Sequence, residues 1–126
     1  MQMATESWVD RSKTAYDTML DQILSEVLEA KNDQIGDLEK LAGSEGSNTH
    51  CRTAAVQRLA QLKGPDAIPF FRAILDPNKT SNADVRYEAL IWLIHLLAIG
   101  SSEHEEIVKI ASKDPNDKIR WIVSLD

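Results

Sequence analysis

Histidine and cysteine are the side chains in this sequence whose chemistry most readily serves a base, a nucleophile or a metal ligand. The chain has three histidines and one cysteine. His50 and Cys51 are adjacent and could supply two zinc ligands, but a structural zinc site uses four ligands in spaced pairs, and the second pair is missing. We therefore expect neither a metal nor another cofactor, and we expect Cys51 to be a small residue of the core.

The other two histidines have no catalytic setting in the sequence. His95 stands between Ile94 and Leu96 in an apolar run, and no motif provides it with a nucleophile and an orienting acid. We expect it to be a packing residue, and we expect His104, near the acidic start of a helix, to be solvated. A phosphate-binding glycine loop and a nucleophile elbow are also missing from the sequence, so we predict that the protein is not an enzyme.

The negative charge of the chain is concentrated in its first third. The formal net charge is −6. Residues 1–46 hold ten acidic and four basic side chains, whereas residues 47–126 hold ten of each. Binding to a nucleic-acid backbone depends on positive charge that displaces counterions, so this distribution argues against a nucleic-acid partner. It favours a protein partner of basic character.

Length and composition are those of one ordinary globular domain. The chain has 126 residues, of which 43% are hydrophobic and 27% charged. The first residues lack the basic and apolar regions of a signal peptide. The longest apolar run, 89–99, is shorter than the roughly 20 residues that span a membrane. We therefore expect a cytoplasmic protein without a membrane partner.

The spacing of apolar residues is helical along the whole chain, and no segment alternates as a strand does. Asn82 and Ser102 are expected to cap two of the helices, and Gly64 to end another. The fold class is therefore predicted to be all-α, with helices over 5–30, 34–42, 49–62, 66–75, 82–98, 103–113 and 117–125.

Three arginines mark an internal repeat. Arg52, Arg86 and Arg120 are evenly spaced along the chain, and apolar residues recur at matching distances after them. The triplet Asp-Pro-Asn also recurs, at 76–78 and 114–116, before two of the arginine-bearing helices. A period of this length indicates stacked helical units, because one helix pair cannot bury its apolar face alone.

The repeated residues resemble the HEAT-repeat family. The segment Asp84-Val85-Arg86 and the segment Asp117-x-Ile119-Arg120 are similar to the signature that opens the first HEAT helix, and Ala67-Ile68-Pro69 resembles the start of the second. The tryptophan-based pattern of tetratricopeptide repeats is missing. The resemblance implies a right-handed α-solenoid of about three antiparallel helix pairs plus a short C-terminal helix. Its single domain, 1–126, would comprise a divergent N-terminal pair (5–46), HEAT-like pairs (49–76 and 82–113) and a terminal half-unit (117–125).

The same resemblance implies a structural role for the repeated charges. Charge-assisted hydrogen bonds between arginines and aspartates would tie successive units together. The residues expected in this role are Arg52, Arg86, Arg120, Asp84 and Asp117.

Acidic side chains and one tryptophan are the candidates for partner binding. On the predicted first helix, Glu6, Asp10, Asp17 and Asp21 project within about 60° of one another and could attract basic side chains. Glu103, Glu105 and Glu106 open a later helix, where they either interact with the helix dipole or face a partner. Trp121 is expected to be exposed in the terminal unit, and exposed tryptophan often anchors an interface.

These observations favour a non-enzymatic protein-binding module. A small acidic helical chain is similar, in size and charge only, to bacterial immunity or inhibitor proteins that block a toxic enzyme. We expect a monomer, or a heterodimer with a basic protein partner such as a toxin. One alternative is a fragment or subunit of a larger HEAT scaffold. Another is a HEAT-like lyase or nucleic-acid-acting protein, as the bilin lyases and DNA glycosylases of this type are.

Overall fold

The computed structural model describes residues 7–13 and 16–124, and within these ranges the chain is helical and contains no strand. The predicted all-α class is therefore confirmed. The α-helices are α1 (Trp8–Lys13), α2 (Asp17–Leu28), α3 (Ile35–Ala42), α4 (Thr49–Lys63), α5 (Ile68–Leu75), α6 (Ala83–Leu96), α7 (Ser102–Ala111) and α8 (Asp117–Val123). Short 3-10 helices, Asn32–Gln34 and Gly64–Ala67, precede α3 and α5.

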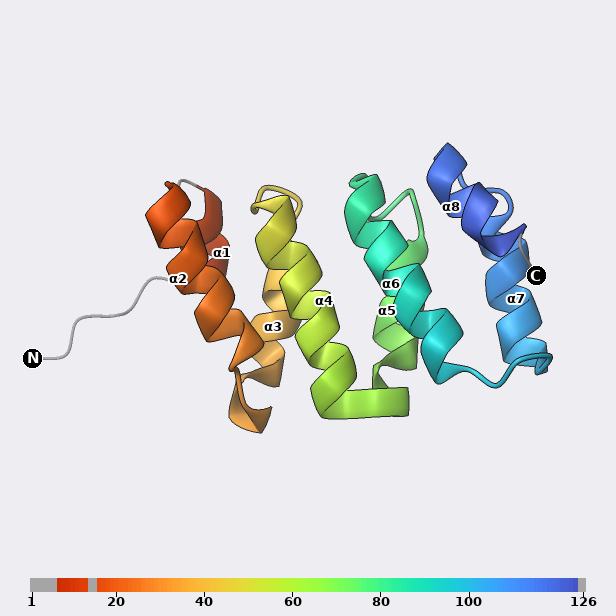
Figure 1. Ribbon diagram of the computed structural model, residues 1–126, viewed down its shortest axis with the longest axis horizontal. Helices are drawn as coiled ribbons and strands as arrows, with labels where there is room; N and C mark the ends of the chain where they lie inside the picture. The colour runs from red at the N-terminus through yellow and green to blue at the C-terminus, as the bar shows by residue number, and fades with distance from the viewer. Residues whose placement is uncertain (1–6, 14–15, 125–126) are drawn as a thin grey trace, which may run out of the picture.

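The helices pack in two rows along the long axis of the molecule (Figure 1). In one row α2, α4, α6 and α8 follow one another, and each contacts the next. The helices between them in sequence lie behind this row, where α3 packs against α4 and α5 packs against α6. One end of the molecule is formed by α1 and α2, and the other by α7 and α8.

A single apolar core extends through both rows. Every α-helix contributes buried apolar side chains to it, from Trp8 in α1 to Val123 in α8. Helix α4 contributes mainly small residues, among them Ala55 and Cys51. The side chain of Cys51 is fully buried, as predicted, and burial raises the pKa of its thiol. The continuity of this core explains why units of similar sequence stay together.

The predicted single helix over 5–30 is wrong, because the segment forms two helices. Tyr16 is extended immediately before α2. Ser7 opens α1: its hydroxyl accepts a hydrogen bond from the backbone N–H of Asp10 and donates one to the Asp10 carboxylate, both at 3.1 Å. This Ser-x-x-Asp pattern is itself a signal for a helix start. Helix α1 then packs against α2 and α3, which buries Trp8.

Three asparagines cap three helices at a regular interval. Asn48, Asn82 and Asn116 are spaced as evenly as the repeat arginines and are the N-caps of α4, α6 and α8. In each case the side-chain oxygen accepts hydrogen bonds from the second and third backbone N–H groups of the helix, at 2.9–3.3 Å. The cap at Asn82 was predicted, and the other two obey the same period. The repeat therefore includes the helix starts as well as the arginines.

The start of α7 differs from the prediction in two details. Its N-cap is Ser101 rather than Ser102, and the Ser101 hydroxyl accepts from the backbone N–H of His104 at 3.2 Å. His104 was expected to be solvated but is only 6% exposed. It precedes the buried Ile107 and Ala111 by three and seven residues, a spacing that directs all three side chains to the core.

The repeat arginine of α6 forms a buried ion pair with the loop before α8. Arg86 donates two hydrogen bonds to the carboxylate of Asp114, both at 3.0 Å, and these side chains are 4% and 2% exposed. Its third nitrogen donates to the backbone carbonyls of Thr80 and Ser81, at 2.8 and 3.0 Å. Each nitrogen of the buried guanidinium therefore has a hydrogen-bond partner, and its charge is neutralised across two successive units.

The expected link between units through Asp84 is not formed. Asp84 is exposed and makes no ion pair within the ranges that the structure describes. Asp117 pairs with Arg120 of its own helix, so this contact does not join two units. The carboxylate that crosses between units is Asp114, which the sequence presents only as part of a helix break.

The three repeat arginines have related but unequal surroundings. Arg120 donates to the backbone carbonyl of Asp114 at 2.6 Å. Arg52 donates from Nε to the carbonyl of Ala42 at 3.1 Å and has a terminal nitrogen 3.8 Å from the carboxylate of Glu45. Burial lowers the pKa of the Arg52 guanidinium, against the effect of Glu45. Its second terminal nitrogen, Nη2, is buried and has no hydrogen-bond partner among the described residues.

Within the described ranges, Arg52 Nη2 lacks a partner because a threonine, Thr80, occupies the position at which the next unit has Asp114. The carbonyl of Thr80 accepts from Arg86, six residues later, just as the carbonyl of Asp114 accepts from Arg120. Thr80 and Asp114 therefore occupy equivalent positions. Asp114 also supplies a carboxylate to the arginine of the preceding unit, whereas Thr80, at the same separation from Arg52, is buried and uncharged.

Loss of the Asp114 carboxylate is expected to destabilise the protein strongly. Asp114→Ala leaves the buried charge of Arg86 without a counter-charge, a change that costs about 3–5 kcal/mol of unfolding free energy. The control is Asp117→Ala, whose carboxylate is 94% exposed and whose loss costs less than about 1 kcal/mol. Urea unfolding followed by circular dichroism measures both, and equal losses in the two variants would contradict the role of Asp114.

A carboxylate at position 80 is expected to stabilise the protein. Thr80→Asp places a carboxylate at the position equivalent to Asp114, where it can accept a hydrogen bond from Arg52. We expect the unfolding free energy to rise by about 1 kcal/mol, after the cost of desolvating the new charge. Thr80→Asn is the matched control, because it has nearly the same shape without the charge. Thermal and urea unfolding compare the two, and an aspartate variant that is less stable than the asparagine variant contradicts the equivalence.

Candidate functional site

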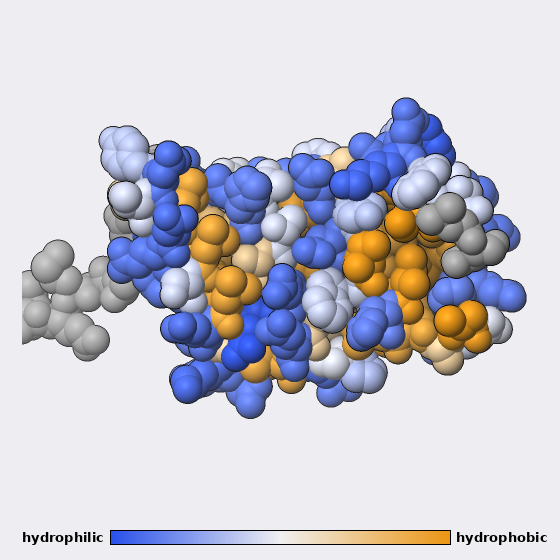
Figure 2. Space-filling model, in the orientation of Figure 1, coloured by the Kyte–Doolittle hydropathy of each residue, from blue (hydrophilic) through white to orange (hydrophobic). Residues whose placement is uncertain are grey.

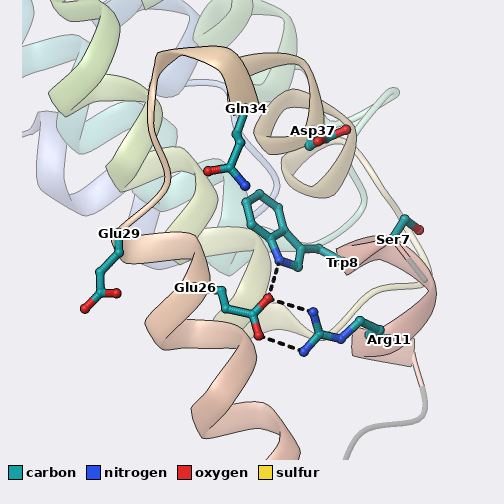
Figure 3. Close-up of a pocket in the computed structure, with 7 residues that line it drawn as sticks. All are labelled: Ser7, Trp8, Arg11, Glu26, Glu29, Gln34 and Asp37. Carbon is teal, nitrogen blue, oxygen red and sulfur yellow. Dashed lines mark hydrogen bonds and ion pairs between the residues drawn. The ribbon is translucent and has the colours of Figure 1, made fainter. Parts of the chain in front are cut away.

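A pocket of about 530 Å³ lies at the N-terminal end of the molecule, where α1 packs against α2 and α3 (Figure 3). Carboxylates outnumber basic groups in its lining by three to one, so the pocket is acidic. The lining residues are Ser7, Trp8, Arg11, Glu26, Glu29, Gln34 and Asp37.

Glu26 is the centre of the polar network in this pocket (Figure 3). The two terminal nitrogens of Arg11 donate to its two carboxylate oxygens at 2.7 and 2.9 Å, and the indole N–H of Trp8 donates at 3.1 Å. The hydrogen bond from Arg11, with a smaller contribution from Trp8, lowers the pKa of Glu26 from 4.5 to about 2 against the opposing effect of burial. Glu26 is therefore ionised at neutral pH and links α2 to α1.

The remaining acids of the pocket are available to a ligand. Glu29 and Asp37 are exposed and form no hydrogen bond or ion pair with their side chains in the described part of the chain. Figure 3 shows the ring of Trp8 between Gln34 and Glu26, which leaves these polar groups at its edges. Carboxylate and amide oxygens accept hydrogen bonds, so the pocket suits a cationic group such as the side chain of lysine or arginine.

The predicted acidic stripe is divided between α1 and α2. Asp10, Asp17 and Asp21 are all exposed, and both helices lie at the same end of the molecule (Figure 1). They do not share one helix face as expected, because they lie on two separate helices, and Asp10 takes part in the cap of α1. Glu6 lies outside the described residues.

The second group of predicted acids lies at the opposite end of the molecule (Figure 1). Glu103, Glu105 and Glu106 are exposed in the first turns of α7, and Glu106 pairs with Arg72 of α5. The two groups of acids therefore do not form one surface. Trp121 is 59% exposed on α8, which confirms its predicted exposure but does not test its role in binding.

One face of the molecule also carries apolar surface in two places (Figure 2). The first lies over α2. Helix α2 includes Met19 and Leu28, which are each 41% exposed. The second lies over α6 beside α8. Hydrophilic residues separate the two over α4.

The residues that build the pocket were not predicted as a site. Trp8 and Arg11 are three residues apart and share one face of α1, which is a usable signal. Their partner Glu26 is 15 residues beyond Arg11, and only the packing of α1 against α2 brings them together. The periodicity of a continuous helix could not indicate this contact.

Comparisons with known proteins add no relative. The chain matches no protein-family model, no curated protein and no solved structure. Within residues 7–13 and 16–124, no three histidine, cysteine, aspartate or glutamate side chains are grouped so that they could hold a metal ion. None of the helices in these ranges is long and apolar enough to cross a membrane.

The Glu26 network predicts a specific loss of stability in acid. The pKa of Glu26 is lower in the folded protein, so its contribution is complete above about pH 4.5 and is lost as the pH falls toward about 2. Because the side chain is 36% exposed, we expect this loss to be on the order of 1 kcal/mol. Urea unfolding at pH 5 and pH 3 measures it in the wild type and in Glu26→Gln, and an equal decline in both proteins would contradict the assignment.

Proposed function

We propose that this protein is a non-enzymatic protein-binding module that uses its acidic N-terminal end to occlude a basic partner. Its proposed architecture is a HEAT-like right-handed α-solenoid. The shared, even spacing of the asparagine caps and of the repeat arginines supports that architecture, as does the packing of α2, α4, α6 and α8 in one row.

The observation that carries the functional proposal is the charge of one end of the molecule. Among the described residues up to position 46, nine side chains are acidic and four are basic. Three of these acids, Glu26, Glu29 and Asp37, line the pocket beside Trp8, and helices α1, α2 and α3 form this end of the molecule. One of the four basic side chains, Arg11, already pairs with Glu26, so the remaining acids still outnumber the remaining bases by eight to three.

A basic partner fits this end by charge and by shape. Exposed carboxylates attract a positively charged protein at long range, which raises the association rate and makes binding weaker in high salt. At short range the pocket offers Glu29 and Asp37 as acceptors for a lysine or arginine of the partner. Inhibition would then follow from steric and electrostatic occlusion, as in a small immunity or inhibitor protein that blocks a toxin.

A second candidate function is that of a subunit in a larger helical scaffold. The exposure of Trp121 favours it, because a large aromatic side chain at the end of a helical stack is suited to contact a further unit. This role does not exclude binding at the N-terminal end.

Reversal of charge at the acidic end is expected to weaken partner binding. Asp17→Lys/Asp21→Lys changes two exposed side chains of α2 and should lower the affinity for a captured basic partner at least tenfold, because close charge pairs across an interface contribute about 1.5 kcal/mol or more. The partner is captured from the source cell, and its affinity is then measured by titration calorimetry at low and high salt.

The matched control is Glu103→Lys/Glu105→Lys, which makes the same change of charge in exposed residues at the other end of the molecule. It should leave the affinity unchanged. Equal affinities of the wild type and both variants, or a larger loss in the control, would exclude the acidic end as the binding surface.

A further inference from the structure

Helices α6 and α8 are equivalent members of the repeat, and this equivalence identifies one face of α8 that no other described helix covers. A shift by one repeat period relates Arg86 to Arg120 and Tyr87 to Trp121. Arg86 and Arg120 make equivalent hydrogen bonds, because each donates to the backbone carbonyl of the residue six positions before it. The face of α6 that bears Arg86 and Tyr87 therefore corresponds to the face of α8 that bears Arg120 and Trp121.

On α6 this face is covered by the start of the next unit. Asp114 supplies the carboxylate for Arg86, and Lys118 places its ammonium 4.3 Å from the ring centre of Tyr87. A covering helix must thus bring a carboxylate to the arginine and pack its first turn on the aromatic ring. Both contacts come from the region where α8 begins.

On α8 the equivalent side chains, Arg120 and Trp121, are partly exposed to solvent. Among the described elements α8 packs against α6 and α7, and Trp121 remains 59% exposed. The side chain of Arg120 is 41% exposed and its carboxylate partner, Asp117, is 94% exposed in the same helix.

We propose that this face binds the same face of a second copy of the chain, in a two-fold symmetric dimer formed through α8. A two-fold interface must be complementary to itself, since one patch meets an identical patch. Helix α8 has this property, because Asp117 and Arg120 have opposite charges and lie one turn apart. When the α8 helices of two copies pack antiparallel to each other, each Asp117 faces Arg120 of the second copy. Trp121 then packs on the first turn of the other helix, as Tyr87 packs on the first turn of α8.

This contact is distinct from the acidic end of the molecule, which α1, α2 and α3 form at the opposite end (Figure 1). It leaves α1, α2 and the Trp8 pocket accessible in both copies. A dimer would therefore present two acidic ends, and its formation can be measured without any partner.

The test is the mass of the full chain in solution. Sedimentation equilibrium of the wild type, up to on the order of 100 µM because small interfaces bind weakly, should give twice the chain mass of 14.1 kDa. Trp121→Glu should be a monomer at the same concentration, with the dissociation constant raised at least tenfold. Ile99→Glu is the matched control: it changes an apolar side chain outside this face that is 89% exposed, and it should remain a dimer.

Charge reversal tests the pairing directly. Asp117→Lys changes a side chain that is 94% exposed, so the variant is expected to fold, and it places like charges opposite each other in the dimer. We expect it to be a monomer at low salt, with circular dichroism equal to that of the wild type. A wild type that stays monomeric over this range overturns the proposal. So does a dimer that persists in both Trp121→Glu and Asp117→Lys, since its interface must then lie elsewhere.

Discussion

The buried pair of Arg86 and Asp114 is the interaction on which the arrangement of successive units depends. It joins α6 to the loop before α8 with two hydrogen bonds in a region from which water is excluded. Apolar packing alone would allow helices to slide, because it has little directional preference. A bidentate ion pair that also reaches two backbone carbonyls allows one register. The same arginine position in α4 has only part of this network, since its region carries Thr80 in place of a carboxylate.

The two ends of the helical stack have different surfaces. At the N-terminal end the chain folds α1 back onto α2, and the Arg11–Glu26 pair holds it there with the help of the Trp8 indole. This leaves an acidic pocket and exposed aspartates. At the other end α8 repeats the face of α6, and among the described elements no unit covers that face. The two ends differ because a stack of similar units has matched contacts only in its interior.

The sequence predicted most helices well because their starts and ends are marked by strong local signals. Asn82 caps α6 as expected, and Gly64 ends α4 with a positive φ of 55°. The prediction failed where a long-range contact outweighed periodicity. Tyr16 and the residues of α2 continue the apolar spacing of α1, yet α1 and α2 are separate helices, and α1 packs against α2 and α3, which buries Trp8. The acidic stripe, which assumed one continuous helix, was divided for the same reason.

By itself the sequence determined the helical class, the even period of the repeat, the exposure of Trp121 and the excess of acid in the first third of the chain. These properties depend on composition and on spacing along the chain, which local physical rules translate directly. Only the tertiary structure decided that Asp114 rather than Asp84 neutralises Arg86, that Glu26 joins Trp8 and Arg11 in a pocket, and that Glu103 lies far from Asp17. Each of these depends on which distant segments meet, and that is set by the packing of the shared core rather than by any local pattern.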